Sequence, residues 1–305
     1  MTGHLIAATL LTLAAGGACA QQVADRSFQP RLAHPVYARG RGPVVCLDQA
    51  HQNGHTLEGR YWAFGELLRR DGYRLVANTQ ILSATSLAAC RVFVSANARP
   101  ALGPGDTMPR PTPSAFSVDE IAALKTWVDG GGALLLIADH MYSGGAAAKL
   151  AAAFDVDFTD GFALKDPEPQ PSDAFRRSDG TLRDHAITRG RNSGESVSQV
   201  LTFAGQAFHA PRAAPLLVFP PGYVLLLPDK PWEFDVNTPR QPIEGWLQGA
   251  AQEVGRGRAA FFGEAAMFTA QLAGEEREPV GMNTPGAEGN SQFILNVLHW
   301  LTRKL

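Results

Sequence analysis

The sequence predicts an α/β fold in which helices cover both faces of a mostly parallel sheet. Short apolar segments of strand length alternate with segments whose apolar residues recur at helical spacing, along much of the 305-residue chain. Several apolar segments run directly into polar residues, as strands do at the carboxyl edge of a parallel sheet. Neither an internal repeat nor a clear linker divides residues 43–305, so we expect a single domain there, with a β-rich insertion.

The first half of the chain alternates strand and helix patterns. The apolar run Pro43–Leu47 has the length and β-branched content of a buried strand. Ser117 and Glu120 have the spacing of a capping box, and Gly130–Gly132 ends the helix that they open. The Pro- and Gly-rich segment 97–115 has no periodicity, which favours a lid or rim loop. We expect strands at 43–48, 73–77, 91–95 and 133–138, and helices at 57–70, 117–129 and 146–154.

The second half begins with a polar, Pro-containing stretch and continues as the β-rich insertion. Strand patterns recur near 198–204, 214–219 and 223–227. A further strand at 258–263 ends at Glu264, and an amphipathic helix over 291–303 closes the chain.

The N-terminus predicts an exported protein. Leu5–Ala15 is an apolar core too short to span a bilayer, and Ala18-Cys19-Ala20 fits a signal-peptidase site, so residues 1–20 are expected to be a signal peptide. A lipid anchor on Cys19 is the alternative. Residues 21–42, interrupted by Pro and Gly, are expected to be an extended lead-in. We therefore expect a periplasmic or secreted location and no transmembrane segment.

Charge and cysteine content narrow the function classes further. The formal net charge is −2 and the Lys and Arg residues are scattered, which disfavours nucleic acid as a partner. Export would permit a disulfide between Cys46 and Cys90, but two buried free thiols are an equal alternative. Neither cysteine lies on a glycine-flanked turn, so a thiol nucleophile is disfavoured.

Polar residues collect at the ends of three expected strands. Asp48 and His51 follow the first, Asp139 and His140 the fourth, and Glu264 the strand at 258–263. If these strands are parallel neighbours, we expect the side chains of Asp48, His51, Asp139 and Glu264 to lie within about 10 Å of a common point. Our candidate catalytic set is these four residues together with His140.

Two chemistries suit this set. Histidines and carboxylates can hold a divalent metal that activates water, and without metal an Asp–His pair can act as general base with Glu264 as acid. A serine hydrolase is disfavoured because the sequence lacks a G-x-S-x-G elbow. Each residue also has a structural alternative: Asp139 or Glu264 could cap a helix, and His140 could be bonded to backbone.

Further polar residues are candidates for substrate binding: Asn53, His55, Arg60, Gln248 and Asn283. Aromatic side chains, Trp232 among them, could stack on a flat ligand or a sugar. The favoured function is a hydrolase for a small polar or carbohydrate-type substrate. The competing hypothesis is a non-catalytic ligand-binding or assembly domain of the cell envelope. Cofactor and oligomeric state stay open.

The strand-end motif from Asp48 to Asn53, the block Gly130–His140 and the C-terminal segment Asn290–Trp300 together resemble a group of exported bacterial proteins. Their fold is similar to the class I glutamine amidotransferase-like domain, a flavodoxin-like α/β fold. The resemblance covers roughly residues 41–305 and implies the fold more than the function. True amidotransferases carry a nucleophilic Cys after a central strand, where this chain has Asp139-His140. The resemblance therefore implies a protein that is not a Cys-dependent glutamine amidotransferase.

Overall fold

The computed structural model describes residues 22–30, 32, 34–103 and 105–305. The predicted signal peptide, residues 1–20, lies outside the described residues. None of the helices in the described ranges has the length and apolar character needed to cross a membrane.

A nine-stranded sheet forms the centre of the molecule. Its first half is parallel, as predicted, and its second half is antiparallel, which was not predicted, so "mostly parallel" describes only part of the sheet. The parallel strands, in spatial order, are β3 (Arg74–Asn78), β2 (Val44–Asp48), β4 (Val92–Ala96), β5 (Ala133–Ile137) and β15 (Gly257–Phe262). The antiparallel strands are β14 (Leu247–Val254), β10 (Phe208–His209), β6 (Asp157–Phe158) and β11 (Ala214–Val218), the last paired with β14.

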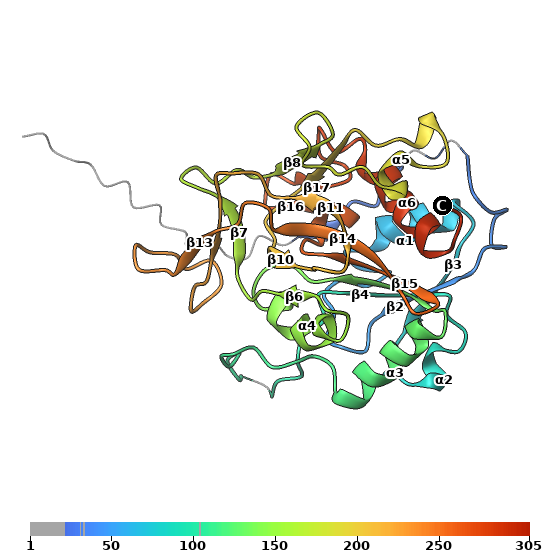
Figure 1. The fold of residues 1–305 in the computed structure, drawn as a ribbon, viewed down its shortest axis with the longest axis horizontal. Coiled ribbons are helices and arrows are strands. Elements are labelled where there is room, and N and C mark those ends of the chain that lie inside the picture. The colour runs from blue at the N-terminus through green and yellow to red at the C-terminus, as the bar shows by residue number, and fades with distance from the viewer. Residues whose placement is uncertain (1–21, 31, 33, 104) are drawn as a thin grey trace, which may run out of the picture.

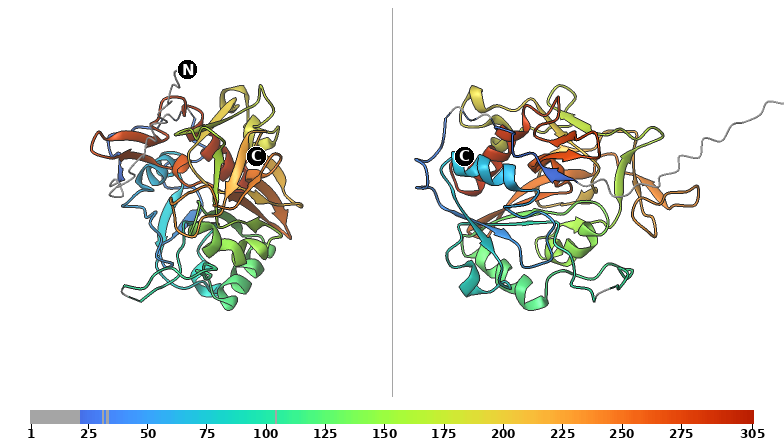
Figure 2. Two further views of the ribbon diagram at one scale, coloured as in Figure 1. Left: turned by 90° about the vertical axis from the view of Figure 1, so that its left-hand side faces the viewer. Right: turned by 180° about the vertical axis from the view of Figure 1, so that it is seen from behind.

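Helices lie on both faces of this sheet (Figures 1 and 2). Alternate residues of each central strand face opposite sides, so Leu135 joins one apolar core and Leu134 the other. One core includes residues of α1 (Trp62–Arg70) and α6 (Asn290–Leu301). The other includes residues of α2 (Ala84–Leu87), α3 (Val118–Asp129) and α4 (Ser143–Ala152). This two-sided cover leaves the carboxyl edge of the parallel strands for polar groups.

The capping box at the start of α3 is confirmed: the Ser117 side chain accepts from the Glu120 N–H, and the Glu120 carboxylate accepts from the Ser117 N–H. Helix α1 begins later than predicted, at Trp62 instead of Leu57. The chain before it turns back on itself, with the Gly59 and Tyr61 N–H groups donating to the Thr56 carbonyl. Strand β14 escaped prediction because its Ala- and Gly-containing sequence has only one of the β-branched residues that mark strands, Val254.

The remaining strands form three small antiparallel sheets around the carboxyl edge. The lead-in contributes a strand that was not predicted, β1, to one of them. The members are β1 (Val23–Ala24), β16 (Ala270–Ala273) and β17 (Glu278–Gly281); β13 (Arg240–Pro242), β12 (Tyr223–Leu226) and β7 (Phe162–Lys165); and β8 (Asp173–Arg176) with β9 (Gln199–Thr202). The short helices α5 (Ala186–Arg189), η1 (Ser193–Glu195) and η2 (Ala266–Phe268) complete the chain.

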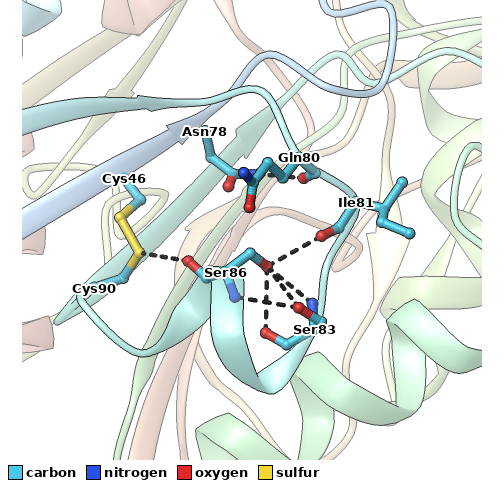
Figure 3. Close-up of a disulfide and its surroundings, with 7 residues drawn as sticks. All are labelled: Cys46, Asn78, Gln80, Ile81, Ser83, Ser86 and Cys90. Carbon is cyan, nitrogen blue, oxygen red and sulfur yellow. Dashed lines mark hydrogen bonds between the residues drawn. A yellow bond between two sulfur atoms is a disulfide. The ribbon is translucent and has the colours of Figure 1, made fainter.

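A disulfide joins Cys46 to Cys90, which decides between the two alternatives left open by the sequence. It ties the middle of β2 to the turn that leads into β4, the neighbouring strand (Figure 3). The Cα atoms are 5.7 Å apart, and the Cys90 sulfur lies 3.7 Å from the Ser86 carbonyl oxygen.

Candidate functional site

A polar pocket of about 290 Å³ opens at the carboxyl edge of the parallel strands. It brings together residues that follow β4, β5 and β15 and residues of the surrounding loops. Its lining is Gln22, His55, Arg60, Asn97, Arg99, Asp139, His140, Met141, Ser143, Pro171, Phe203, Ala204, Trp232, Glu264, Ala266, Gln271 and Val280. Five residues predicted from the sequence are among them: His55, Arg60, Asp139, His140 and Glu264.

Asp139 and Glu264 form the carboxyl pair of this pocket. They are brought together because β5 and β15 are parallel neighbours with Ile137 opposite Phe262, so each carboxyl residue comes two positions after that pair. Glu264 is fully buried, and its two oxygens accept the N–H groups of Ala266 at 2.5 Å and Met267 at 2.8 Å. The Asp139 side chain, 15% exposed, accepts the His140 N–H at 2.8 Å.

The electrostatics of the pair favour protonation. Burial raises the pKa of Asp139, and the charge of His140 only partly opposes this. Burial and then the charge of Asp139 raise the pKa of Glu264 well above its usual range. Both charges also act on Tyr61, whose hydroxyl pKa is raised by burial first. Because the two carboxyls titrate as a pair, these directions belong to the pair and not to one residue.

The structure does not support the helix-cap alternative for Asp139. The N-cap residue of α4 is Tyr142, whose side chain makes no cap hydrogen bond, and the Gly145 N–H in the first turn donates to the Asp160 carboxylate at 3.3 Å. Instead Asp139 is positioned from β4: its backbone N–H donates to the Asn97 side-chain oxygen at 2.8 Å.

His55 lines the pocket together with two arginines, Arg60 and Arg99. Its ring is 4% exposed and packs against Tyr61 with ring centroids 4.9 Å apart. Burial, followed by the positive charges of Arg60 and Arg99, lowers the pKa of His55 to about 3, so the imidazole is neutral at physiological pH. Among the described residues, Nδ1 of His55 has no hydrogen-bond partner. A buried polar atom without a partner is costly, which marks His55 as a group that a ligand could satisfy.

His140 belongs to an aromatic cluster at the other part of the lining. Its Nδ1 lies 2.8 Å from the Met141 carbonyl oxygen, which bears out the backbone-bonded alternative. The His140 ring stacks on the Phe162 ring, with centroids 4.4 Å apart. The Trp232 ring packs edge-on against it, with centroids 4.8 Å apart. Trp232 is 53% exposed and also contacts Phe162 and Phe234. We call Phe162, Trp232 and Phe234 the aromatic shelf.

Asp48 and His51 are not among the residues that line this pocket. The Asp48 carboxylate accepts from Ser95, the Ala50 N–H and the His51 ring, whose Nδ1 lies 2.8 Å from Oδ1. On its other side, Nε2 of His51 lies 2.9 Å from the Glu120 carboxylate. Glu120 also accepts the Leu82 N–H. The Asp48–His51–Glu120 network therefore ties the end of β2 to the start of α3, and every member has its hydrogen bonds satisfied.

The charges in this network explain how it joins β2 to α3. Burial alone would lower the pKa of His51, but the hydrogen bond to Asp48 and the charges of Asp48 and Glu120 outweigh it, so the pKa is raised. Burial alone would raise the pKa of Glu120, but hydrogen bonds from the Ser117 and Leu82 N–H groups and from His51 lower it to about 2. An imidazolium between two carboxylates is the result.

The other predicted binding residues lie away from the pocket lining. The Asn53 side chain donates to the Ala96 carbonyl at 3.0 Å, and that of Asn283 donates to Asp25 and to the Gln271 carbonyl. Gln248 is fully buried in β14, and neither its side-chain oxygen nor its nitrogen has a partner among the described residues. The geometry gives Asn53 and Asn283 structural contacts, and we have no physical account of Gln248.

The sequence analysis considered a divalent metal, but the described residues do not provide a set of ligands for one. Within the described ranges, no group of three or more His, Cys, Asp or Glu side chains converges as a metal site would require. Asp139 and Glu264 come together, but the histidine of the β2 motif is held elsewhere. We therefore derive no step through a metal.

The sequence analysis missed Asn97 and Arg99. Asn97 and Arg99 follow β4 directly, so the strand-end rule applied to the other strands would have found them.

No family model and no curated protein matches the chain. Among solved structures, the mmIFT52 N-terminal domain matches with a TM-score of 0.59 at 13% identity, over 85% of this chain and 97% of that one. A ThuA-like protein from Bacteroides uniformis matches with a TM-score of 0.47 at 11% identity, over 88% and 95%. A β-galactosidase from Bacillus circulans sp. alkalophilus matches with 0.42 at 10% identity, over 85% of this chain and 30% of that one. At these identities, the likeness to the mmIFT52 domain shows that this chain shares an α/β fold with it, and shows nothing of function.

Proposed function

We propose that the protein is an exported hydrolase that acts on a small polar or carbohydrate-type substrate in the strand-end pocket. The observation that carries this proposal is the Asp139–Glu264 pair, a largely buried and a fully buried carboxyl with raised pKa values in the lining of a pocket. Carboxyls whose environment separates their protonation states are a common source of acid and base in hydrolysis.

The proposed reaction uses one proton held by the pair. The protonated carboxyl donates its proton to the leaving oxygen of the substrate as the bond to that oxygen breaks. The ionised carboxyl accepts a proton from a water molecule, whose oxygen forms the new bond to the substrate. The two carboxyls have then exchanged roles, and proton exchange with solvent restores the starting state.

The neighbours of the pair have supporting roles in this proposal. Neutral His55 would accept a hydrogen bond from, or donate one to, the substrate, because its Nδ1 has no partner in the part of the chain that the structure describes. Asn97 would hold Asp139 in place through the Asp139 N–H. His140 would orient the substrate together with the aromatic shelf.

The fold relationship and the location are parts of the same proposal. A class I glutamine amidotransferase-like origin is supported by the parallel half of the sheet and by the turn after β5, where Asp139-His140 stands in place of a nucleophilic Cys. Export to the periplasm or beyond is supported by the N-terminal pattern and is compatible with the Cys46–Cys90 disulfide.

One observation favours the alternative, a ligand-binding domain without turnover. Both oxygens of Glu264 accept backbone N–H groups at the start of η2, as a purely structural cap would. In that case the pocket recognises a ligand and Glu264 holds the loop beneath it.

A hydrolysis assay separates the two. The protein would be tested on nitrophenyl glycosides and esters between pH 4 and 8, beside Asp139→Asn, Glu264→Gln and the exposed control Asp157→Asn. We expect turnover by the parent protein and Asp157→Asn, and a loss of about 100-fold or more in kcat for either pocket variant. Turnover that survives both pocket substitutions, or ligand binding without any turnover, would overturn the hydrolase proposal.

A further inference from the structure

The pocket lining combines two permanent cations with an exposed aromatic side chain, Trp232, and the hydrolytic proposal gives the cations no role. Arg60 and Arg99 both line the pocket, and both charges act on His55. The carboxyl pair does not neutralise Arg99: within the described part of the chain, no ion pair or side-chain hydrogen bond is seen between Arg99 and Asp139 or Glu264. The carboxyl oxygens are instead engaged by backbone N–H groups.

A guanidinium stays charged at every physiological pH and offers several N–H donors in a plane. The charges of Arg60 and Arg99 both lower the pKa of the buried His55, so the potential at this part of the pocket lining is positive. An anionic group on a ligand would lower this electrostatic energy and would form charge-assisted hydrogen bonds, the strongest kind in proteins.

The aromatic shelf supplies the second half of the recognition. Trp232 is a large apolar side chain that is half exposed at the pocket, and it is held in place by Phe162 and His140. Its backbone has a φ of 65°, a left-handed conformation that a bulky residue adopts only where the surroundings enforce it. An indole face of this kind packs well against the C–H face of a sugar ring. The pocket volume, about 290 Å³, suits a ligand of monosaccharide size.

We propose that the pocket binds a sugar ring that carries an anionic group, with the anion at Arg60 and Arg99 and the ring against Trp232. The inference rests on the pocket of the proposed hydrolase and names its substrate class. A carboxylate, as in a uronic acid, and a phosphate share the chemistry that the arginines recognise.

Calorimetric titration of the whole protein tests this class directly. The probes are glucuronate, galacturonate and glucose 6-phosphate, with glucose and galactose as the neutral counterparts. We expect at least one anionic sugar to bind about 10-fold or more tightly than its neutral counterpart, the effect of about one charge-assisted contact. A tighter carboxylate series or a tighter phosphate series identifies the anion. Equal binding of charged and neutral sugars, or no binding of any anionic sugar, would overturn the proposal.

Variants connect the effect to the residues. Arg99→Gln is expected to weaken the anionic sugar about 10-fold and to leave the neutral sugar unchanged. Trp232→Ala is expected to weaken both, and Trp232→Phe to restore most of the affinity. Arg212→Gln, which changes an exposed arginine paired with Asp155, is the matched control and should have no effect. An equal loss in Arg99→Gln and Arg212→Gln would contradict a specific contact.

The sugar-binding test can succeed or fail independently of the hydrolysis assay. Free monosaccharides have no glycosidic bond to hydrolyse, so their binding is independent of turnover. Anionic sugars that bind to a protein without turnover would keep this inference and remove the proposed function. Hydrolysis confined to neutral glycosides would do the reverse.

Discussion

Two groups of buried polar side chains follow strands of the same sheet, and they differ in how fully they are satisfied. In the Asp48–His51–Glu120 network, both ring nitrogens and both carboxylates have partners, and the three residues join β2 to α3. In the pocket, the pKa values of Asp139 and Glu264 are raised, and one ring nitrogen of His55 has no partner among the residues that the structure describes. The first arrangement stabilises the fold, and the second leaves bonding capacity for a ligand.

The comparison shows what residue type alone does not. An Asp and a His beside a strand end suggest a site in either region, yet a histidine held by two carboxylates is fully used in binding its neighbours. His55, by contrast, is buried near the charges of two arginines, and its Nδ1 has no partner among the described residues. Partners, more than identities, separate a structural group from a candidate functional one.

Removing the ring of His51 should have the largest effect on stability. His51→Ala leaves two buried carboxylates without their shared cation, so we expect a loss of about 3–5 kcal/mol in the free energy of unfolding. Urea denaturation measures it, with His34→Ala, at an exposed histidine, as the control. A loss below about 1 kcal/mol would mean that the network is not the structural tie that its geometry indicates.

Removing the disulfide should have the second largest effect on stability. Cys46 and Cys90 are 44 positions apart, and the double variant Cys46→Ser/Cys90→Ser frees that loop in the unfolded chain, at a cost of about 2–4 kcal/mol. Ligand binding at the pocket should persist under conditions where the variant is folded, because neither cysteine lines it. A variant that folds but loses binding would show that the two regions are coupled.

The pH dependence of stability should differ between the two regions, because the network stabilises the folded state whereas an ionised pocket carboxyl destabilises it. The raised pKa of His51 contributes stability that is fully present below its usual value of 6.5 and is lost as pH rises through the folded value. The lowered pKa of Glu120 contributes stability that is present above 4.5 and is lost as pH falls toward about 2. The network should therefore stabilise most between pH 4.5 and 6.5. Thermal unfolding of the parent protein and His51→Ala across pH 3–9 tests this window, and a constant difference between them would contradict it.

Neutralising one pocket carboxyl should have the smallest effect, and in the opposite direction. Because the pKa of Asp139 is raised, its ionised form disfavours the folded state, and Asp139→Asn should stabilise by about 1 kcal/mol at pH 7. The gain should shrink as pH falls through the raised pKa of Asp139 in the folded protein, and it should be gone below the ordinary carboxyl value of 3.8, where both states are protonated. Differential scanning calorimetry at pH 7 and pH 3 measures the change. A destabilising substitution would assign Asp139 to the structural group.

The sequence by itself determined the parallel half of the sheet, four of the helices that cover it (α1, α3, α4 and α6) and the polar character of its carboxyl edge. These follow from local information: β-branched runs such as Val44–Val45, the capping box of Ser117 and Glu120, and helical spacing in 291–303. It did not determine the antiparallel half, because strands such as β14 are recognisable only by their pairing partners.

Only the tertiary structure decided which strand-end residues share a pocket. Glu264 reaches Asp139 because β15 inserts beside β5 from the far end of the chain, whereas His51 is held by Glu120, which a distant helix supplies. The Cys46–Cys90 pairing was decided in the same way, by β2 and β4 lying side by side. Hydrogen-bond partners and burial depend on contacts between residues far apart in sequence, and those contacts set both the pKa values and the bonds left for a ligand.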